Sequence, residues 1–119
     1  MDPHFDGVIF QTDANELHRR IGREFPPFLV LDVRDSADFA SAHIPGAVSV
    51  SPSDIDGGLP RGAELGTEFF VVGSGPGDDG VRAASLALME NAARRIVELR
   101  GGMSEWSSYG YPTDSDSKS

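Results

Sequence analysis

Residues 28–50, "FLVLDVRDSADFASAHIPGAVSV", decide the fold class of this chain. The stretch begins with a near-continuous apolar run, Phe28 to Val33, which is typical of a strand buried on both faces of a parallel sheet. The next residues predict a short helix with Ser36 as its N-cap, because a serine hydroxyl accepts hydrogen bonds from the first helical N–H groups. A turn at Pro45-Gly46 then leads into another strand at about Val48 to Val50.

The rest of the chain continues this alternation of strands and helices. Further strands are expected at residues 8–10, 69–72 and 95–99, and further helical segments at 12–23, 80–91 and 103–112, with a glycine-rich loop and one short helix within 51–67. Asp13 followed by Glu16 fits a capping box at the start of the first helix. We therefore predict one α/β domain over residues 1–112, with a five-stranded, mostly parallel sheet and helices on both faces. Residues 113–119 are expected to form a disordered polar tail.

Charge and composition narrow the possible partners. The 119 residues include 10 Lys and Arg against 19 Asp and Glu, a formal net charge of −9. Nucleic acid and anionic membranes require a basic surface, so neither is expected as a main partner, whereas a protein with a basic surface fits this charge. The N-terminal segment is acidic and no apolar run reaches about 18 residues, so we expect neither a secretory signal nor a membrane span and a cytoplasmic location.

Cysteine is absent from the sequence. Its absence excludes disulfides, thiolate metal sites and every mechanism that forms a persulfide on this chain. We expect no cofactor and no metal.

Two segments of the chain resemble the signatures of the rhodanese-like domain family. The first contains Asp32, Arg34, Asp38-Phe39 and His43-Ile44-Pro45-Gly46-Ala47, and the second contains Leu99, Gly101-Gly102, Trp106, Gly110, Tyr111 and Pro112. The resemblance implies a single α/β domain with a five-stranded parallel sheet. Structural roles are expected for the signature side chains: an ion pair between Asp32 and Arg34, a backbone hydrogen bond from His43 in the turn before Pro45, and packing of Trp106 and Tyr111.

The resemblance also implies where the active site of the family would lie. In that family a cysteine after the fourth strand opens a loop of the form Cys-x-x-Gly-x-Arg-Ser, takes sulfur from a donor such as thiosulfate and becomes a persulfide. The backbone N–H groups of the loop and the following helix surround the sulfur and bind anions. Placed on this pattern without gaps, Ser74 falls on the cysteine, Gly77 on the glycine, Asp79 on the arginine and Gly80 on the serine.

This loop therefore has the length of the family pattern but lacks its cysteine nucleophile and its arginine. Ser74 supplies no sulfur and is not ionised without a base, and Asp78 and Asp79 place negative charge where an anionic donor should bind. We predict a catalytically inactive domain that is a protein-binding or regulatory module, as inactive members of the family are thought to be, with Ser74, Asp78 and Asp79 as binding residues. The vestigial active-site loop consists of Gly73, Ser74, Gly75, Pro76, Gly77, Asp78, Asp79 and Gly80.

Several alternatives remain open for this loop. The two aspartates can cap the following helix and fill the anion site themselves, or bind a cation or a basic side chain of a partner. The domain can also be a thiosulfate sulfurtransferase-related enzyme of altered chemistry that binds a small ligand with the same loop, or depend on a cysteine of its partner. Residues 75–80 formally fit the dinucleotide pattern Gly-x-Gly-x-x-Gly with Glu98 as its acid, and Ser74 with His43 suggests a hydrolase triad, although the Gly-x-Ser-x-Gly elbow is missing.

Overall fold

Five parallel strands form one sheet in the order β1-β5-β4-β2-β3. The computed structural model describes residues 9–23, 26–64 and 66–115. The strands are β1 (Ile9–Thr12), β2 (Phe28–Asp32), β3 (Val48–Ser49), β4 (Glu68–Val72) and β5 (Arg95–Leu99), and the helices are α1 (Ala14–Ile21), α2 (Ser36–Ser41), α3 (Pro52–Asp56), α4 (Asp79–Glu90) and α5 (Gly102–Ser108). All four strand pairings are parallel, which confirms the predicted sheet.

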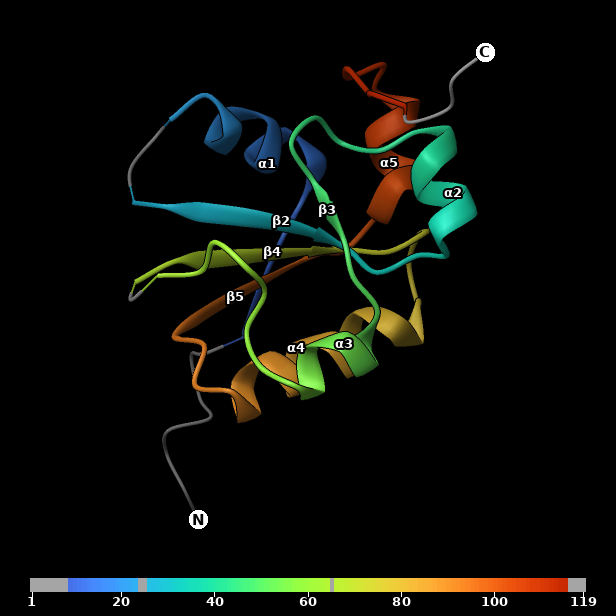
Figure 1. Ribbon diagram of the computed structural model, residues 1–119. Helices are drawn as coiled ribbons and strands as arrows, with labels where there is room; N and C mark the ends of the chain where they lie inside the picture. The colour runs from blue at the N-terminus through green and yellow to red at the C-terminus, as the bar shows by residue number, and fades with distance from the viewer. Residues whose placement is uncertain (1–8, 24–25, 65, 116–119) are drawn as a thin grey trace.

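Helices cover both faces of this sheet, as the sequence predicts (Figure 1). α1, α2 and α5 lie on one face, and α3 and α4 lie on the other. Along β4, Phe70 and Val72 belong to the core beneath α1 and α5, whereas Phe69 and Val71 belong to the core beneath α3 and α4. β2 and β4 in the middle of the sheet are almost wholly apolar because both of their faces are covered.

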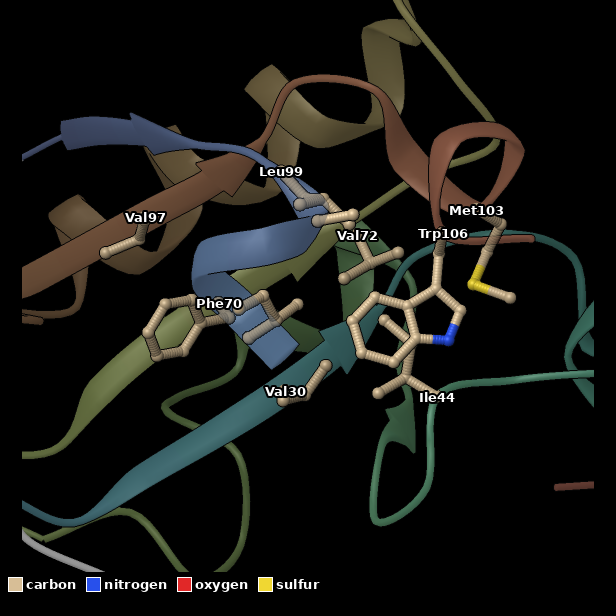
Figure 2. Close-up of a cluster of buried hydrophobic side chains, with 10 residues drawn as sticks. Val30, Ile44, Phe70, Val72, Val97, Leu99, Met103 and Trp106 are labelled. Carbon is tan, nitrogen blue, oxygen red and sulfur yellow. The ribbon is translucent and has the colours of Figure 1, made fainter. Parts of the chain in front are cut away.

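Trp106 is the largest side chain of the core beneath α1 and α5. Figure 2 shows its indole ring beside Ile44, Val72 and Met103, and the residue is buried. Nε1 of the indole donates to the carbonyl oxygen of Pro112 at 2.8 Å, which satisfies the one polar atom of the ring. The packing role predicted for Trp106 is confirmed.

The helix starts differ in part from the sequence predictions. Asp13 accepts a hydrogen bond from the N–H of Glu16 at 2.9 Å, but the side chain of Glu16 pairs with Arg19, so the predicted capping box is one-sided. The N-cap of α2 is Asp35 and not Ser36, because the backbone is extended at Asp35 and already helical at Ser36.

A complete capping box lies instead at α3, within the segment that the sequence predicts to be mostly loop. The hydroxyl of Ser51 accepts from the N–H of Asp54, and the Asp54 carboxylate accepts from the N–H of Ser51. Pro52 follows the N-cap, where its missing N–H costs no helical hydrogen bond. The pattern is visible in the sequence as Ser-Pro-Ser-Asp.

The first signature holds the carboxyl end of β2 to the end of α2. Nη2 of Arg34 lies 2.8 Å from Oδ2 of Asp32 and donates to the carbonyl oxygen of Ala42 at 2.6 Å, which confirms the predicted ion pair. The ring of His43 stacks on Phe39, and its Nδ1 lies 2.8 Å from the Phe39 carbonyl oxygen. The expected hydrogen bond between His43 and the backbone is therefore present, and its partner lies in α2.

Part of the predicted disordered tail is paired with the domain. Asp114 forms an antiparallel bridge with His43 through two backbone hydrogen bonds of 2.9 and 2.8 Å. Residues 116–119 of the tail, and Val8 of the first predicted strand, lie outside the described residues. No helix within the described ranges is long and apolar enough to cross a membrane.

Candidate functional site

The glycine-rich loop, Gly73–Gly80, follows β4 at the carboxyl end of the sheet. β4 neighbours β2, but the crossover after β4 passes through α4 on one face and the crossover after β2 passes through α2 on the other (Figure 1). The carboxyl ends of two such strands mark the place where α/β sheets commonly bind ligands. The topology thus puts the loop where a binding site is expected.

The start of α5 forms one wall of this loop. The N–H groups of Met103 and Ser104 donate to the carbonyl oxygens of Gly73 and Ser74, each at 2.9 Å. Gly102 has a φ of 56°, and a Cβ on it would lie 2.6 Å from the Gly73 carbonyl oxygen. A glycine is required here because the second signature and the loop touch backbone to backbone.

The carboxylate of Asp78 occupies the loop. Its Oδ2 accepts from the N–H of Ser74 and its Oδ1 accepts from the N–H of Gly80, both at 2.8 Å, and Asp78 is the N-cap of α4. A Cβ added at Gly73 would lie 2.5 Å from Oδ2, so the backbone closes tightly around the carboxylate. Two N–H groups of the loop are thus bonded to a side chain of the protein itself.

Ser74 and Asp79 lie on the rim of the loop and are exposed. Asp79 is the first residue of α4, where its charge complements the helix dipole. Among the described residues, the side chains of Ser74 and Asp79 take part in no hydrogen bond or ion pair. The three predicted binding residues are therefore close together in the loop but differ in role, since Asp78 faces inward and the other two face solvent.

A cleft of about 400 Å³ borders the loop on the side of β5 and β1. Its lining comprises Gln11, Gly75, Pro76, Gly77, Asp78, Asp79, Val81, Arg82, Glu98, Leu99 and Arg100. The carboxylate of Glu98 is buried and receives two hydrogen bonds of 2.9 Å from Arg82, one to each oxygen. One signal in the sequence pointed to this pair, namely a glutamate beside the apolar residues of β5.

The Arg82 guanidinium keeps Glu98 ionised. Burial alone would raise the pKa of the Glu98 carboxyl, but the hydrogen bonds from Arg82 and Gln11 favour the charged form, and the pKa is lowered from its ordinary value. The hydrogen bonds to Glu98 and its negative charge raise the pKa of Arg82. The cleft therefore contains a fixed, neutralised ion pair next to the exposed charge of Asp79.

One of the alternative interpretations of the loop finds little support in this geometry. The dinucleotide pattern needs free N–H groups for a pyrophosphate and a free acid for a ribose, whereas Asp78 occupies the N–H groups of Ser74 and Gly80 and Arg82 holds Glu98. No group of three or more His, Asp or Glu side chains in the described part of the chain is placed to hold a metal ion.

One family model matches most of the chain, and several known proteins are similar to it. The sequence model of the rhodanese-like domain matches residues 13–109. The chain is 32% identical over 100 residues to the HTH-type transcriptional regulator Rv0324 of Mycobacterium tuberculosis, but that match covers 83% of this chain and only 42% of the regulator. The crystal structure of the Alr3790 protein from Anabaena is 30% identical with a TM-score of 0.76, covering 87% of this chain and 82% of that one. Thiosulfate sulfurtransferase from Pseudomonas aeruginosa is 31% identical with a TM-score of 0.69, covering 91% of this chain and 20% of that one.

Proposed function

This chain belongs to the rhodanese-like domain family, and we propose that it is a member without sulfurtransferase activity that acts as a protein-binding or regulatory module. One observation carries the proposal. In a chain without cysteine, the carboxylate of Asp78 accepts the N–H groups of Ser74 and Gly80, where the family pattern puts the nucleophile and the following serine.

The chemistry of sulfur transfer supports the inactive half of the proposal. A persulfide forms when a thiolate attacks a sulfane sulfur, and Ser74 has no sulfur with which to form the new S–S bond. The donor is an anion, and Asp78 already holds two of the backbone donors that would bind it. Asp79 adds a second negative charge at the mouth of the loop, where the family pattern has an arginine.

The negative charge around the loop supports the second part of the proposal, that the domain binds a protein. Asp79 is exposed and makes no ion pair among the described residues, so it can receive a basic side chain of a partner. Surface charges of this kind steer association and set specificity more than they add affinity. The similarity to a transcriptional regulator, of which this chain spans less than half, favours a regulatory setting.

The activity is tested with a thiosulfate-to-cyanide sulfur transfer assay on the purified chain. We expect no thiocyanate above a protein-free control. Replacing Ser74 by cysteine alone is expected to leave the chain inactive, whereas Ser74→Cys with Asp78→Gly and Asp79→Arg should give measurable turnover. Glycine is chosen at residue 78 because it is a better N-cap than alanine. Turnover by the unchanged chain would refute the proposal.

Binding is tested by titrating a short arginine- and lysine-rich peptide into the ¹⁵N-labelled chain. We expect saturable shifts of the loop amides that weaken with salt and weaken further in Asp79→Asn. Asp56→Asn is the matched control, because Asp56 is exposed at the end of α3 and away from the loop. Equal binding by the two variants would exclude the loop as the recognition surface.

The 400 Å³ cleft beside the loop favours one second candidate, an altered chemistry on a small ligand. Its volume falls within the range of small-molecule sites, roughly 300–1,000 Å³. Crystals soaked in anions and in cations separate the two functions. A ligand ordered by Ser74 Oγ, Asp79 or Arg100 would favour the enzyme, and an empty cleft would favour the binding module.

A further inference from the structure

The cleft beside the loop contains charges of both signs, whereas the binding proposed above uses only a negative one. Its lining residues come from the loop, the start of α4 and the carboxyl ends of β1 and β5, and all of them lie within the described ranges. The gaps in these ranges at residues 24–25 and 65 come just before β2 and β4, next to the amino ends of the strands. The charged side chains of the cleft can therefore be taken one by one.

An ion pair forms the fixed part of the cleft. Nε and Nη2 of Arg82 donate to the two carboxylate oxygens of Glu98, each at 2.9 Å, and Nε2 of Gln11 lies 3.4 Å from Oε1 of the same carboxylate. Glu98 is buried, whereas the Arg82 side chain is 56% exposed. Nη1 of Arg82 has no hydrogen-bond partner among the described residues. The pair thus cancels its own charge and still leaves the Nη1 donors for a ligand.

Arg100 supplies a free positive charge. Its N–H donates to the carbonyl oxygen of Thr12 at 3.1 Å, so its main chain is tied to β1 at the end of the sheet. The residue is exposed, lines the cleft, and has no side-chain hydrogen bond or ion pair within the described part of the chain. A guanidinium without a partner matches a carboxylate, which it can bind through two parallel N–H donors.

Asp79 supplies the opposite charge on the loop side of the same cleft. It is exposed, and its carboxylate is bonded to no side chain that the structure describes. The loop wall itself is open, because a Cβ added at Gly77 would meet no atom within 4 Å. A free carboxylate and a free guanidinium therefore line one volume of about 400 Å³. An occupant with a single charge leaves one of the two unpaired.

We propose that this cleft receives a segment of a partner protein that carries a basic and an acidic side chain close together. The basic side chain pairs with Asp79, and the acidic one pairs with Arg100 and with Nη1 of Arg82. The inference rests on the proposed binding function of the loop and adds the acidic member of the recognised pair. Opposite charges at two points fix the register of a bound segment and exclude partners with a different charge pattern.

The test titrates four capped pentapeptides into the ¹⁵N-labelled chain at about 0.15 M salt. Two are mixed peptides, with one lysine and one glutamate separated by a serine, in either order; the third has glutamine for the glutamate, and the fourth has glutamine for the lysine. We expect saturable shifts at Gly77, Asp79 and Arg100, and a mixed peptide that binds about threefold tighter than either singly charged peptide, as one exposed ion pair would give. Attraction to a chain of net charge −9 favours the lysine-only peptide, so net charge cannot produce this order.

Substitutions assign the two charges. Arg100→Gln should lower the affinity for the mixed peptide to that for the lysine-only peptide, and Asp79→Asn should lower it to that for the glutamate-only peptide. Arg94→Gln is the matched control, because it removes the same charge from an exposed residue just before β5, at the other end of that strand, and it should keep the preference. Arg82 is left in place, because its removal would leave the buried Glu98 without its main partner.

The outcomes separate this inference from the proposed function. The inference is overturned if the lysine-only peptide binds as tightly as both mixed peptides, or if Arg100→Gln keeps the preference. Weaker binding in Asp79→Asn would then still support recognition by the loop. If Asp79→Asn binds every peptide as the unchanged chain does, both are overturned. If no pentapeptide gives saturable shifts, the inference is overturned, and the longer basic peptide decides the proposed function.

Discussion

Replacing Asp78 by alanine tests whether its carboxylate holds the loop together. The substitution removes the acceptor of two hydrogen bonds of 2.8 Å and the N-cap of a 12-residue helix. An N-cap is worth roughly 0.5–2 kcal/mol, and hydrogen bonds to a charged group roughly 1.5–3 kcal/mol each before water replaces them. Because the residue is only half-buried and water can reach the freed N–H groups, we expect a loss of about 2 kcal/mol in the free energy of unfolding.

Asp79→Ala is the matched control for this prediction. It removes the same charge one residue later, but Asp79 makes no side-chain hydrogen bond among the described residues, so only the helix-dipole effect of about 0.5 kcal/mol is lost. Urea unfolding can be followed by the fluorescence of Trp106, the one tryptophan and 1% exposed. Amide exchange at Ser74 and Gly80 should quicken in Asp78→Ala alone. Equal losses of stability in the two variants would refute the reasoning.

Three further substitutions test other contacts. Glu98→Gln should reduce the change of the unfolding free energy with pH, because the pKa of Glu98 is lowered in the folded protein. The stability that ionised Glu98 contributes is full above its unfolded-state pKa of about 4.3 and is lost as the pH falls through its folded-state pKa. An unchanged pH profile of urea midpoints would contradict this. Ala92→Gly should stabilise the protein by about 0.5–1 kcal/mol, because Ala92 has a φ of 69°, and a lower melting temperature would contradict this. Gly102→Ala should cost about 1–3 kcal/mol, because its Cβ would meet the Gly73 carbonyl oxygen at 2.6 Å, and wild-type stability would contradict this.

The sequence predicts the strands well because burial on both faces leaves a clear signal. The apolar runs that become β2 and β4 supply residues to both cores, and their short length between turn residues favours strands over buried helices. Helix starts are less certain, because several acids and hydroxyls compete for the same N–H groups. Asp35, for instance, replaces Ser36 as the N-cap of α2.

Contacts between distant parts of the chain could not be predicted in the same way. Glu105 accepts a hydrogen bond from the N–H of Ala14, 91 residues away, and so supports the start of α1 from α5. Glu68 is bonded by Arg20 and Arg95, which come from two different elements. Such pairs depend on strand order and crossover direction, and local spacing carries no information about either.

The exchange of the nucleophile for a serine does not by itself explain how the loop remains ordered without a ligand. A loop whose N–H groups converge on one point is stabilised by a charged acceptor there, because each hydrogen bond to a charged group contributes about 1.5–3 kcal/mol. Asp78 supplies that acceptor from within the chain, bonded to Ser74 and Gly80. Catalytic sites often lack such internal partners and are less stable for it. Restoring sulfur transfer should therefore require removal of the carboxylate at residue 78 as well as a cysteine at residue 74, and the structural benefit of Asp78 opposes that reversal.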